Sequence, residues 1–178
     1  MANKSFQARK SKSLIKNKVR LVIGILLVGF LIFNWISGRD GKTLEGRVIS
    51  VHDGDTVTLL RDRASHKIRL DGIDCPELGQ AFGKNARQFS ADLAFDKQVT
   101  VYYHEKDRYQ RYLGTVITPG GQNLNRELLK AGLAWHYKDY NSDPILAGLE
   151  IQARREIRGL WSDPRPIPPW EYRRGRRE

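Results

Sequence analysis

The chain has 178 residues, a formal net charge of +11 and a single cysteine, Cys75, so an intramolecular disulfide is excluded. The positive charge comes from the two ends, because residues 1–20 carry seven basic residues and no acid, whereas residues 41–153 carry fifteen of each sign. The high net charge is therefore no evidence for a broad basic face on the central part, and phosphate recognition there must come from a few individually placed arginines.

The N-terminal region has the pattern of a membrane anchor. Residues 1–20 form a basic tail, and the sixteen mostly apolar residues 21–36 would give about 24 Å of helix, a little less than a hydrocarbon core of about 30 Å. The flanking Arg20 and Arg39 can snorkel toward the membrane surface, so we predict a single transmembrane helix. The basic tail would then stay in the cytoplasm and the remainder would lie outside. A cleaved signal peptide, giving a secreted protein, fits the same pattern.

After a linker at residues 37–43, the sequence predicts one globular domain over residues 44–161. Its strand-like runs are short, alternate in polarity and are separated by turn residues, which is typical of a small antiparallel barrel. The Asp53-Gly54 dipeptide predicts a hairpin turn between the first two runs. The five predicted strands are residues 46–51, 56–60, 67–70, 98–103 and 112–118.

Three helical patterns complete the predicted domain, which gives an α+β fold class. Apolar residues recur at helical spacing over residues 82–93, and a short second helix is expected around residues 124–128. A third helix should begin with Asp143 as its N-cap and Pro144 at its first position. Residues 162–178 contain four prolines among arginines and cannot form a core, so we expect a tail that is disordered or bound to the surface.

The segment R-L-D-G-I-D-C-P-E at residues 69–77 concentrates charge at the end of a predicted strand. Pro76 favours an extended conformation before it, which presents Asp74 and Glu77 at that strand end. If the first two strands pair, Asp55 opens the second strand and can lie beside Asp74. Two such carboxylates suit a hard cation such as Ca²⁺, although each motif taken alone is more typical of a turn or a solvated loop.

Taken together, the motifs resemble the thermonuclease family, whose type member is staphylococcal nuclease. The resemblance extends over residues 44–161 and implies an OB-fold, a five-stranded barrel that binds nucleic acid on one face. Its motifs are D-G-D-T (53–56), I-R-L-D-G-I-D-C-P-E (68–77), F-G-K-N-A (82–86), D-R-Y-Q-R (107–111) and N-x-x-L-L-K-A-G-L-A-W (125–135).

The resemblance implies a role for each charged motif residue in phosphodiester cleavage. Arg69 and Arg111 would stabilise the phosphate oxygens, because a guanidinium can bond to two oxygens and stays charged. The alternative for both arginines is a surface salt bridge, to Asp71 or Asp107. Glu77 would orient or deprotonate the attacking water. The implied Ca²⁺ ligands are Asp55, Asp74 and the backbone carbonyl of Cys75, with Asp53 close behind them.

The implied substrate-binding residues depart from the family pattern in places. Arg108 and Tyr109 correspond to the pair that holds a terminal phosphate, and Gln110 replaces a glycine, which puts the direction of Arg111 in question. Tyr140 corresponds to a base-stacking tyrosine, and Tyr137 is a neighbouring candidate. Trp135 is expected in the core.

The sequence therefore predicts a Ca²⁺-dependent nuclease that acts as a monomer on DNA, RNA or both outside the cytoplasm. A non-catalytic OB-fold module that binds nucleic acid at the membrane is an alternative, although a pure binder has no need of Glu77, which would repel phosphate. A surface adhesin is a third hypothesis, which would use the aromatic cluster and the basic tail.

Overall fold

The computed structural model describes residues 42–175. The predicted basic tail, the membrane anchor or signal segment at residues 21–36, and nearly all of the linker lie outside the described residues. Within residues 42–175, no helix is both long and apolar enough to cross a membrane.

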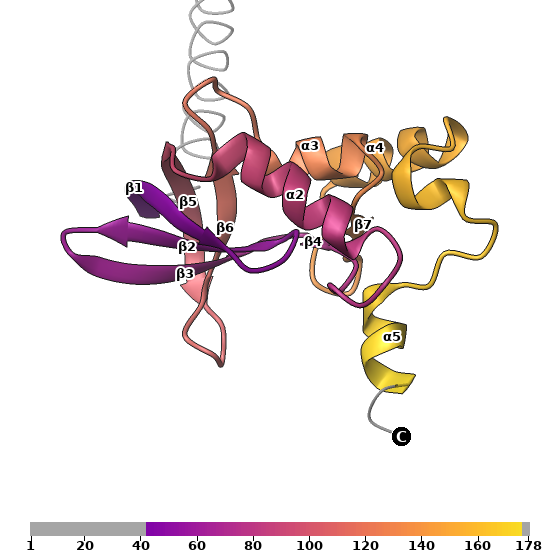
Figure 1. Cartoon of the computed structure of the whole chain (residues 1–178), viewed down its shortest axis with the longest axis horizontal. Helices are drawn as coiled ribbons and strands as arrows, with labels where there is room; N and C mark the ends of the chain where they lie inside the picture. The colour runs from indigo at the N-terminus through magenta and orange to yellow at the C-terminus, as the bar shows by residue number, and fades with distance from the viewer. Residues whose placement is uncertain (1–41, 176–178) are drawn as a thin grey trace, which may run out of the picture. The chain divides into compact units, whose positions relative to one another are not determined.

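Five strands form a closed barrel, and all five were predicted from the sequence (Figure 1). Inward-facing apolar residues alternate with exposed ones along the first strand, where Leu44 and Val48 are buried. This alternation is the reason why the strands could be recognised in the sequence. The barrel strands are β1 (Lys42–Val51), β2 (Thr56–Arg61), β3 (Ala64–Leu70), β5 (Gln98–Lys106) and β6 (Tyr112–Ile117), in the closed order β1-β2-β3-β6-β5.

The expectation of a wholly antiparallel barrel is wrong at one seam. Strands β3 and β6 run parallel, with Ile68 opposite Tyr112 and Leu70 opposite Gly114. The chain between them contains a helix and β5, and such a long crossover allows a parallel return, whereas a tight hairpin does not. The seam places the end of β3 beside the start of β6, and therefore brings Arg69 close to the segment that carries Arg111.

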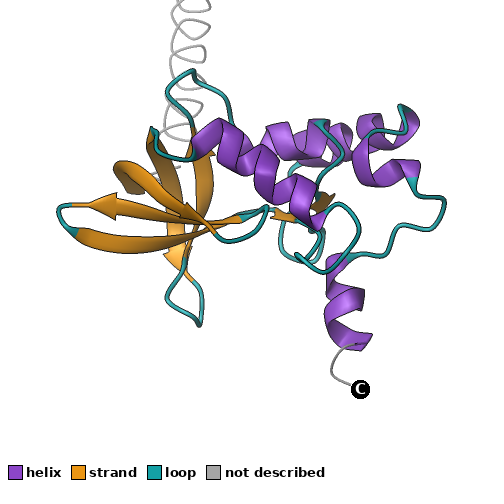
Figure 2. Ribbon diagram, in the orientation of Figure 1, coloured by secondary structure: helices purple, strands orange, loops and turns teal. Residues whose placement is uncertain are grey.

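In the part of the chain that the structure describes, four α-helices gather beside the barrel (Figure 2). The three predicted ones are present, and the third begins as expected, since the Asp143 carboxylate accepts a hydrogen bond from the Ile145 amide at 2.8 Å. The fourth, α5, lies in the C-terminal tail, where no helix was predicted. The helices are α2 (Gly83–Ala94), α3 (Leu124–Lys130), α4 (Pro144–Arg155) and α5 (Pro169–Gly175), with a short 3-10 helix, η1 (Gly159–Ser162).

A small second sheet, not predicted, connects the barrel to the helices. It consists of β4 (Ile73–Asp74) and β7 (Trp135–His136), paired antiparallel. Trp135 is buried in a cluster with Ala153 and Trp161, as expected for a core residue, and the Trp170 ring of α5 packs against the same cluster. The part of the tail that the structure describes is therefore attached to the domain surface.

Candidate active site

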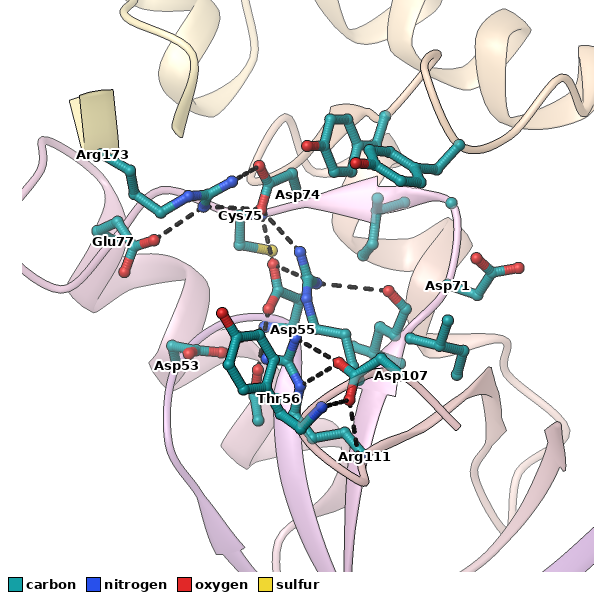
Figure 3. Close-up of a pocket in the computed structure, with 18 of the residues that line it drawn as sticks. Asp53, Asp55, Thr56, Asp71, Asp74, Cys75, Glu77, Asp107, Arg111 and Arg173 are labelled. Carbon is teal, nitrogen blue, oxygen red and sulfur yellow. Dashed lines mark hydrogen bonds and ion pairs between the residues drawn. The ribbon is translucent and has the colours of Figure 1, made fainter. Parts of the chain in front are cut away.

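One cavity of about 630 Å³ is lined by every residue that the sequence singled out for chemistry or substrate binding. It lies where β3 ends and β4 begins, with the 107–111 loop on one side and the aromatic residues after β7 on another (Figure 3). The predicted residues that line it are Asp53, Asp55, Arg69, Asp74, Cys75, Glu77, Arg108, Tyr109, Arg111, Tyr137 and Tyr140.

Arg69 bridges the two buried aspartates at the floor of this cavity. Its Nη1 lies 2.6 Å from Asp55 Oδ2, and its Nη2 lies 2.7 Å from Asp74 Oδ1. The Cys75 amide also donates to Asp55 Oδ2, at 2.6 Å. The alternative pairing of Arg69 with Asp71 is not what forms. Asp55 and Asp74 are thus held side by side, as their positions at strand ends suggested.

The electrostatics of the floor are set by burial and by crowding of like charges. Burial raises the pKa of Asp55 to about 7; Arg69 opposes this rise, while Asp53 and Asp74 add to it. Burial alone would lower the pKa of Arg69, but the two aspartates outweigh it and raise that pKa above its usual value. A further cation beside these carboxylates would therefore favour the ionised form of Asp55.

Arg173, on α5, was not predicted and takes part in the same cluster (Figure 3). Its Nη2 lies 2.8 Å from Asp74 Oδ2, and its Nη1 donates to Glu77 Oε1 at 2.9 Å and to Asp74 Oδ1 at 3.2 Å. The side chain of Asp74 is 1% exposed and that of Glu77 is 34% exposed. Nothing in the sequence distinguishes Arg173 from its neighbouring arginines, so only the fold could identify it.

The 107–111 loop is organised around Asp107. Its Oδ1 accepts hydrogen bonds from the amides of Tyr109 and Arg111, at 2.8 and 3.0 Å, and its Oδ2 accepts from Arg111 Nε at 2.7 Å. Gln110 adopts φ 62°, the left-handed conformation that favours glycine. The ion pair between Arg111 and Asp107, the alternative predicted for this arginine, is formed, and Arg111 nevertheless lines the cavity.

Aromatic rings line the outer part of the cavity. Tyr140 is 76% exposed, and its ring centroid lies 4.6 Å from that of Tyr137. The other side of Tyr137 is stacked on Trp170 of α5, at 5.4 Å and an interplanar angle of 4°. Tyr109 is 63% exposed, with the guanidinium groups of Arg108 and Arg111 near its ring.

The acidic side chains of the cavity have the donor chemistry of a hard-cation site. Within residues 42–175, no three acidic, histidine or cysteine side chains are arranged as a ready-made metal site. The donors are nevertheless carboxylate oxygens, which Ca²⁺ prefers. Of the four carboxylates predicted to hold the metal or the water, three already bind cationic guanidinium groups. The four are Asp53, Asp55, Asp74 and Glu77.

Comparison with known proteins identifies the family to which the chain is similar. Residues 67–163 match the family model of staphylococcal nuclease homologues. An uncharacterized endonuclease of Escherichia coli O157:H7 is 45% identical over 130 residues, which cover 73% of this chain and 85% of that protein. A micrococcal nuclease of Shigella flexneri is 45% identical over 139 residues, covering 72% and 80%. An uncharacterized endonuclease of Haemophilus influenzae is 41% identical over 152 residues, covering 84% and 85%.

The chain belongs to the staphylococcal nuclease family. It is accordingly a nuclease of that family, a hydrolase of phosphodiester bonds, and the described cavity is its candidate active site.

Proposed function

We propose that the protein is a Ca²⁺-dependent nuclease that cleaves DNA, RNA or both outside the cytoplasm. The observation that carries this proposal is the convergence of the four predicted carboxylates with Arg69 and Arg111 on one cavity, in a chain of this family. Phosphodiester hydrolysis needs positive charge at the phosphate oxygens and a carboxylate near the attacking water, and this cavity contains both.

The metal would be held by Asp55, Asp74 and the backbone carbonyl of Cys75, with Asp53 behind them. Asp53 Oδ1 accepts a hydrogen bond from the Asp55 amide at 3.1 Å, which supports a role in orienting Asp55 rather than direct ligation. Bound Ca²⁺ would neutralise negative charge on the phosphate in the transition state.

The protein's own residues would supply the remaining chemistry. Arg69 and Arg111 would bond to the phosphate oxygens, and Glu77 would orient the water or accept its proton. Glu77 suits this task because its carboxylate is partly exposed to the cavity while its neighbour Asp74 is buried. Arg108 and Tyr109, at the exposed loop, would hold a terminal phosphate.

The substrate would lie across the barrel and extend over the aromatic residues. The closed order β1-β2-β3-β6-β5 supports assignment of the barrel as an OB-fold, whose typical ligand is single-stranded nucleic acid or an oligosaccharide. Tyr140 offers an exposed ring on which a base can stack, and Tyr137 lies beside it.

The proposed location rests on the sequence of the N-terminal region. Its apolar run and basic flank favour a single-pass anchor with a cytoplasmic N-terminus and the nuclease domain outside, acting as a monomer. Cell fractionation with and without a signal-peptidase inhibitor distinguishes an anchored protein from a secreted one. An anchored protein stays in the membrane fraction under both conditions, whereas a secreted one accumulates in the membrane only when cleavage is blocked.

A nuclease assay on the full chain tests the activity and the calcium requirement. Release of acid-soluble nucleotides from DNA and from RNA should require Ca²⁺, stop on chelation, and fall by about 10²- to 10⁴-fold in Glu77→Gln. Glu45→Gln, at an exposed position on β1, is the matched control and should keep wild-type activity. Binding of DNA without cleavage by the wild-type protein would instead support the non-catalytic module.

A further inference from the structure

We propose that α5 is a built-in competitor for the metal, in which Arg173 occupies the carboxylates until Ca²⁺ displaces it. This inference rests on the proposed Ca²⁺ site and adds to it a regulatory element from the C-terminal tail.

The guanidinium group of Arg173 contacts the carboxylates of the proposed site as a bound cation would. Its guanidinium lies within hydrogen-bond distance of both oxygens of Asp74 and of one oxygen of Glu77. The other carboxylate among the proposed metal ligands, that of Asp55, is paired with Arg69, which also bonds to Asp74. With Arg173 in place, each oxygen of Asp74 already accepts from a guanidinium, and Glu77 is engaged in an ion pair as well.

These contacts place Arg173 in direct conflict with the proposed chemistry. In the proposed mechanism Asp74 donates an oxygen ligand to the metal and Glu77 acts on water. Arg173 occupies both carboxylates with hydrogen bonds. Ca²⁺ would be a third cation on Asp74, beside Arg69 and Arg173, and like charges repel strongly at a buried carboxylate that is 1% exposed. Ca²⁺ binding should therefore weaken the binding of Arg173 to the carboxylates. By linkage, bound Arg173 should lower the apparent Ca²⁺ affinity by the same factor.

A second contact shows that α5 is docked as a unit rather than by one side chain. Trp170, one turn before Arg173, is stacked on Tyr137 and meets Trp135 edge-on with centroids 5.6 Å apart. Tyr137 is a candidate base-stacking residue, so α5 covers part of the proposed substrate path together with the carboxylates. A helix of seven residues has little stability in water by itself, so α5 should unfold when it leaves this surface.

The decisive measurement is Ca²⁺ affinity by isothermal titration calorimetry on the full chain without nucleic acid. Arg173→Ala should bind Ca²⁺ about tenfold or more tightly than wild type, as expected when a hydrogen-bonded charged competitor is removed. Arg174→Ala is the matched control, because it removes the same charge from the next, exposed residue of α5. It should change the affinity by less than about twofold, as expected for a screened surface charge.

Hydrogen exchange on the wild-type protein gives a second test that needs no variant. Amides of residues 170–175 should exchange faster when Ca²⁺ is added, while those of the barrel should not. If Arg173→Ala binds Ca²⁺ with wild-type or lower affinity, or if Ca²⁺ leaves exchange in α5 unchanged, the competitor role is overturned while the Ca²⁺ site stands. If neither wild type nor Arg173→Ala binds Ca²⁺, the proposed metal site and the competitor role both fail.

Discussion

Arg111 is held at the cavity by Asp107, with Nε and Nη2 of the guanidinium 2.7 and 2.6 Å from the same carboxylate oxygen. Burial opposes ionisation of Asp107, but hydrogen bonds from the Arg111 backbone and side chain and from the Tyr109 amide outweigh it and lower its pKa below the ordinary value of 3.8. The ionised form of Asp107 is therefore part of the loop structure.

The contribution of Asp107 to stability should consequently depend on pH. Because its pKa is lower in the folded state, the contribution is fully present above about pH 4 and is lost as the pH falls through the lowered pKa. Asp107→Asn should therefore be less stable than wild type at pH 7, and the difference should shrink toward pH 2 to 3. Urea unfolding of both proteins across this range checks the sign. A difference that is constant with pH would show that the charge of Asp107 does not stabilise the loop.

Gln110 adopts a backbone conformation that costs an L-residue about 1 to 2 kcal/mol. Gln110→Gly should stabilise the protein by up to about 1 kcal/mol, since glycine removes this cost but has more conformational freedom when unfolded. Activity should be unchanged, because the Arg111–Asp107 contacts do not involve the Gln110 side chain. Gln98→Gly, in strand β5, is the control and should destabilise by about 0.5 to 1 kcal/mol. A loss of activity in Gln110→Gly would indicate that this side chain contacts substrate.

Gly83, at the start of α2, lies against the backbone of Glu77. A Cβ at this position would overlap the Glu77 carbonyl group and lie only 2.6 Å from its carbon atom. Gly83→Ala should therefore destabilise by about 1 to 3 kcal/mol and reduce cleavage, because the segment that carries Glu77 must move.

Gly148, within α4, provides the opposite case, since no atom lies within 4 Å of a Cβ built there. Gly148→Ala should stabilise by about 0.5 to 1 kcal/mol through helix propensity and leave cleavage intact. Thermal unfolding measures the change in stability of each variant, and nuclease assays measure its change in cleavage. Equal behaviour of the two variants would contradict the close approach at Gly83.

Tyr140 should contribute to binding single-stranded nucleic acid by stacking. In a Glu77→Gln background, which prevents cleavage, Tyr140→Ala should weaken oligonucleotide binding by about 1 to 3 kcal/mol. Tyr102→Ala is the control, because the Tyr102 ring is also exposed to solvent but lies on β5 outside the cavity. Fluorescence anisotropy with a labelled oligonucleotide measures the affinity of each variant. Equal effects of the two substitutions would argue against Tyr140 as a stacking site.

Much of the fold could be predicted because its signals are local. Alternation along β1 and the cap at Asp143 depend only on neighbouring residues, and the structure contains both elements. The direction of β6 relative to β3 depends on the path of the intervening chain, so periodicity could not reveal the parallel seam. The two-residue strands β4 and β7 are too short to produce any pattern.

The candidate site was predictable for a different reason. Its residues lie at the ends of recognisable strands and in motifs with fixed spacing, so Asp55, Asp74 and Glu77 could be placed together before any coordinates were known. Arg173 lies 96 residues beyond Glu77 in a proline- and arginine-rich tail. Its position depends on the docking of Trp170 in α5, a tertiary contact for which the sequence contains no local signal.

Because the proposed mechanism uses Arg69 and Arg111 together, nuclease activity should report on closure of the barrel at the parallel seam. Only three residue pairs join β3 to β6; Arg69 belongs to the middle pair, and Arg111 directly precedes β6. Local fraying there would separate the two guanidinium groups while the antiparallel β2–β3 and β5–β6 pairs on either side stay folded. On gradual heating, turnover should therefore cease several degrees before circular dichroism records global melting.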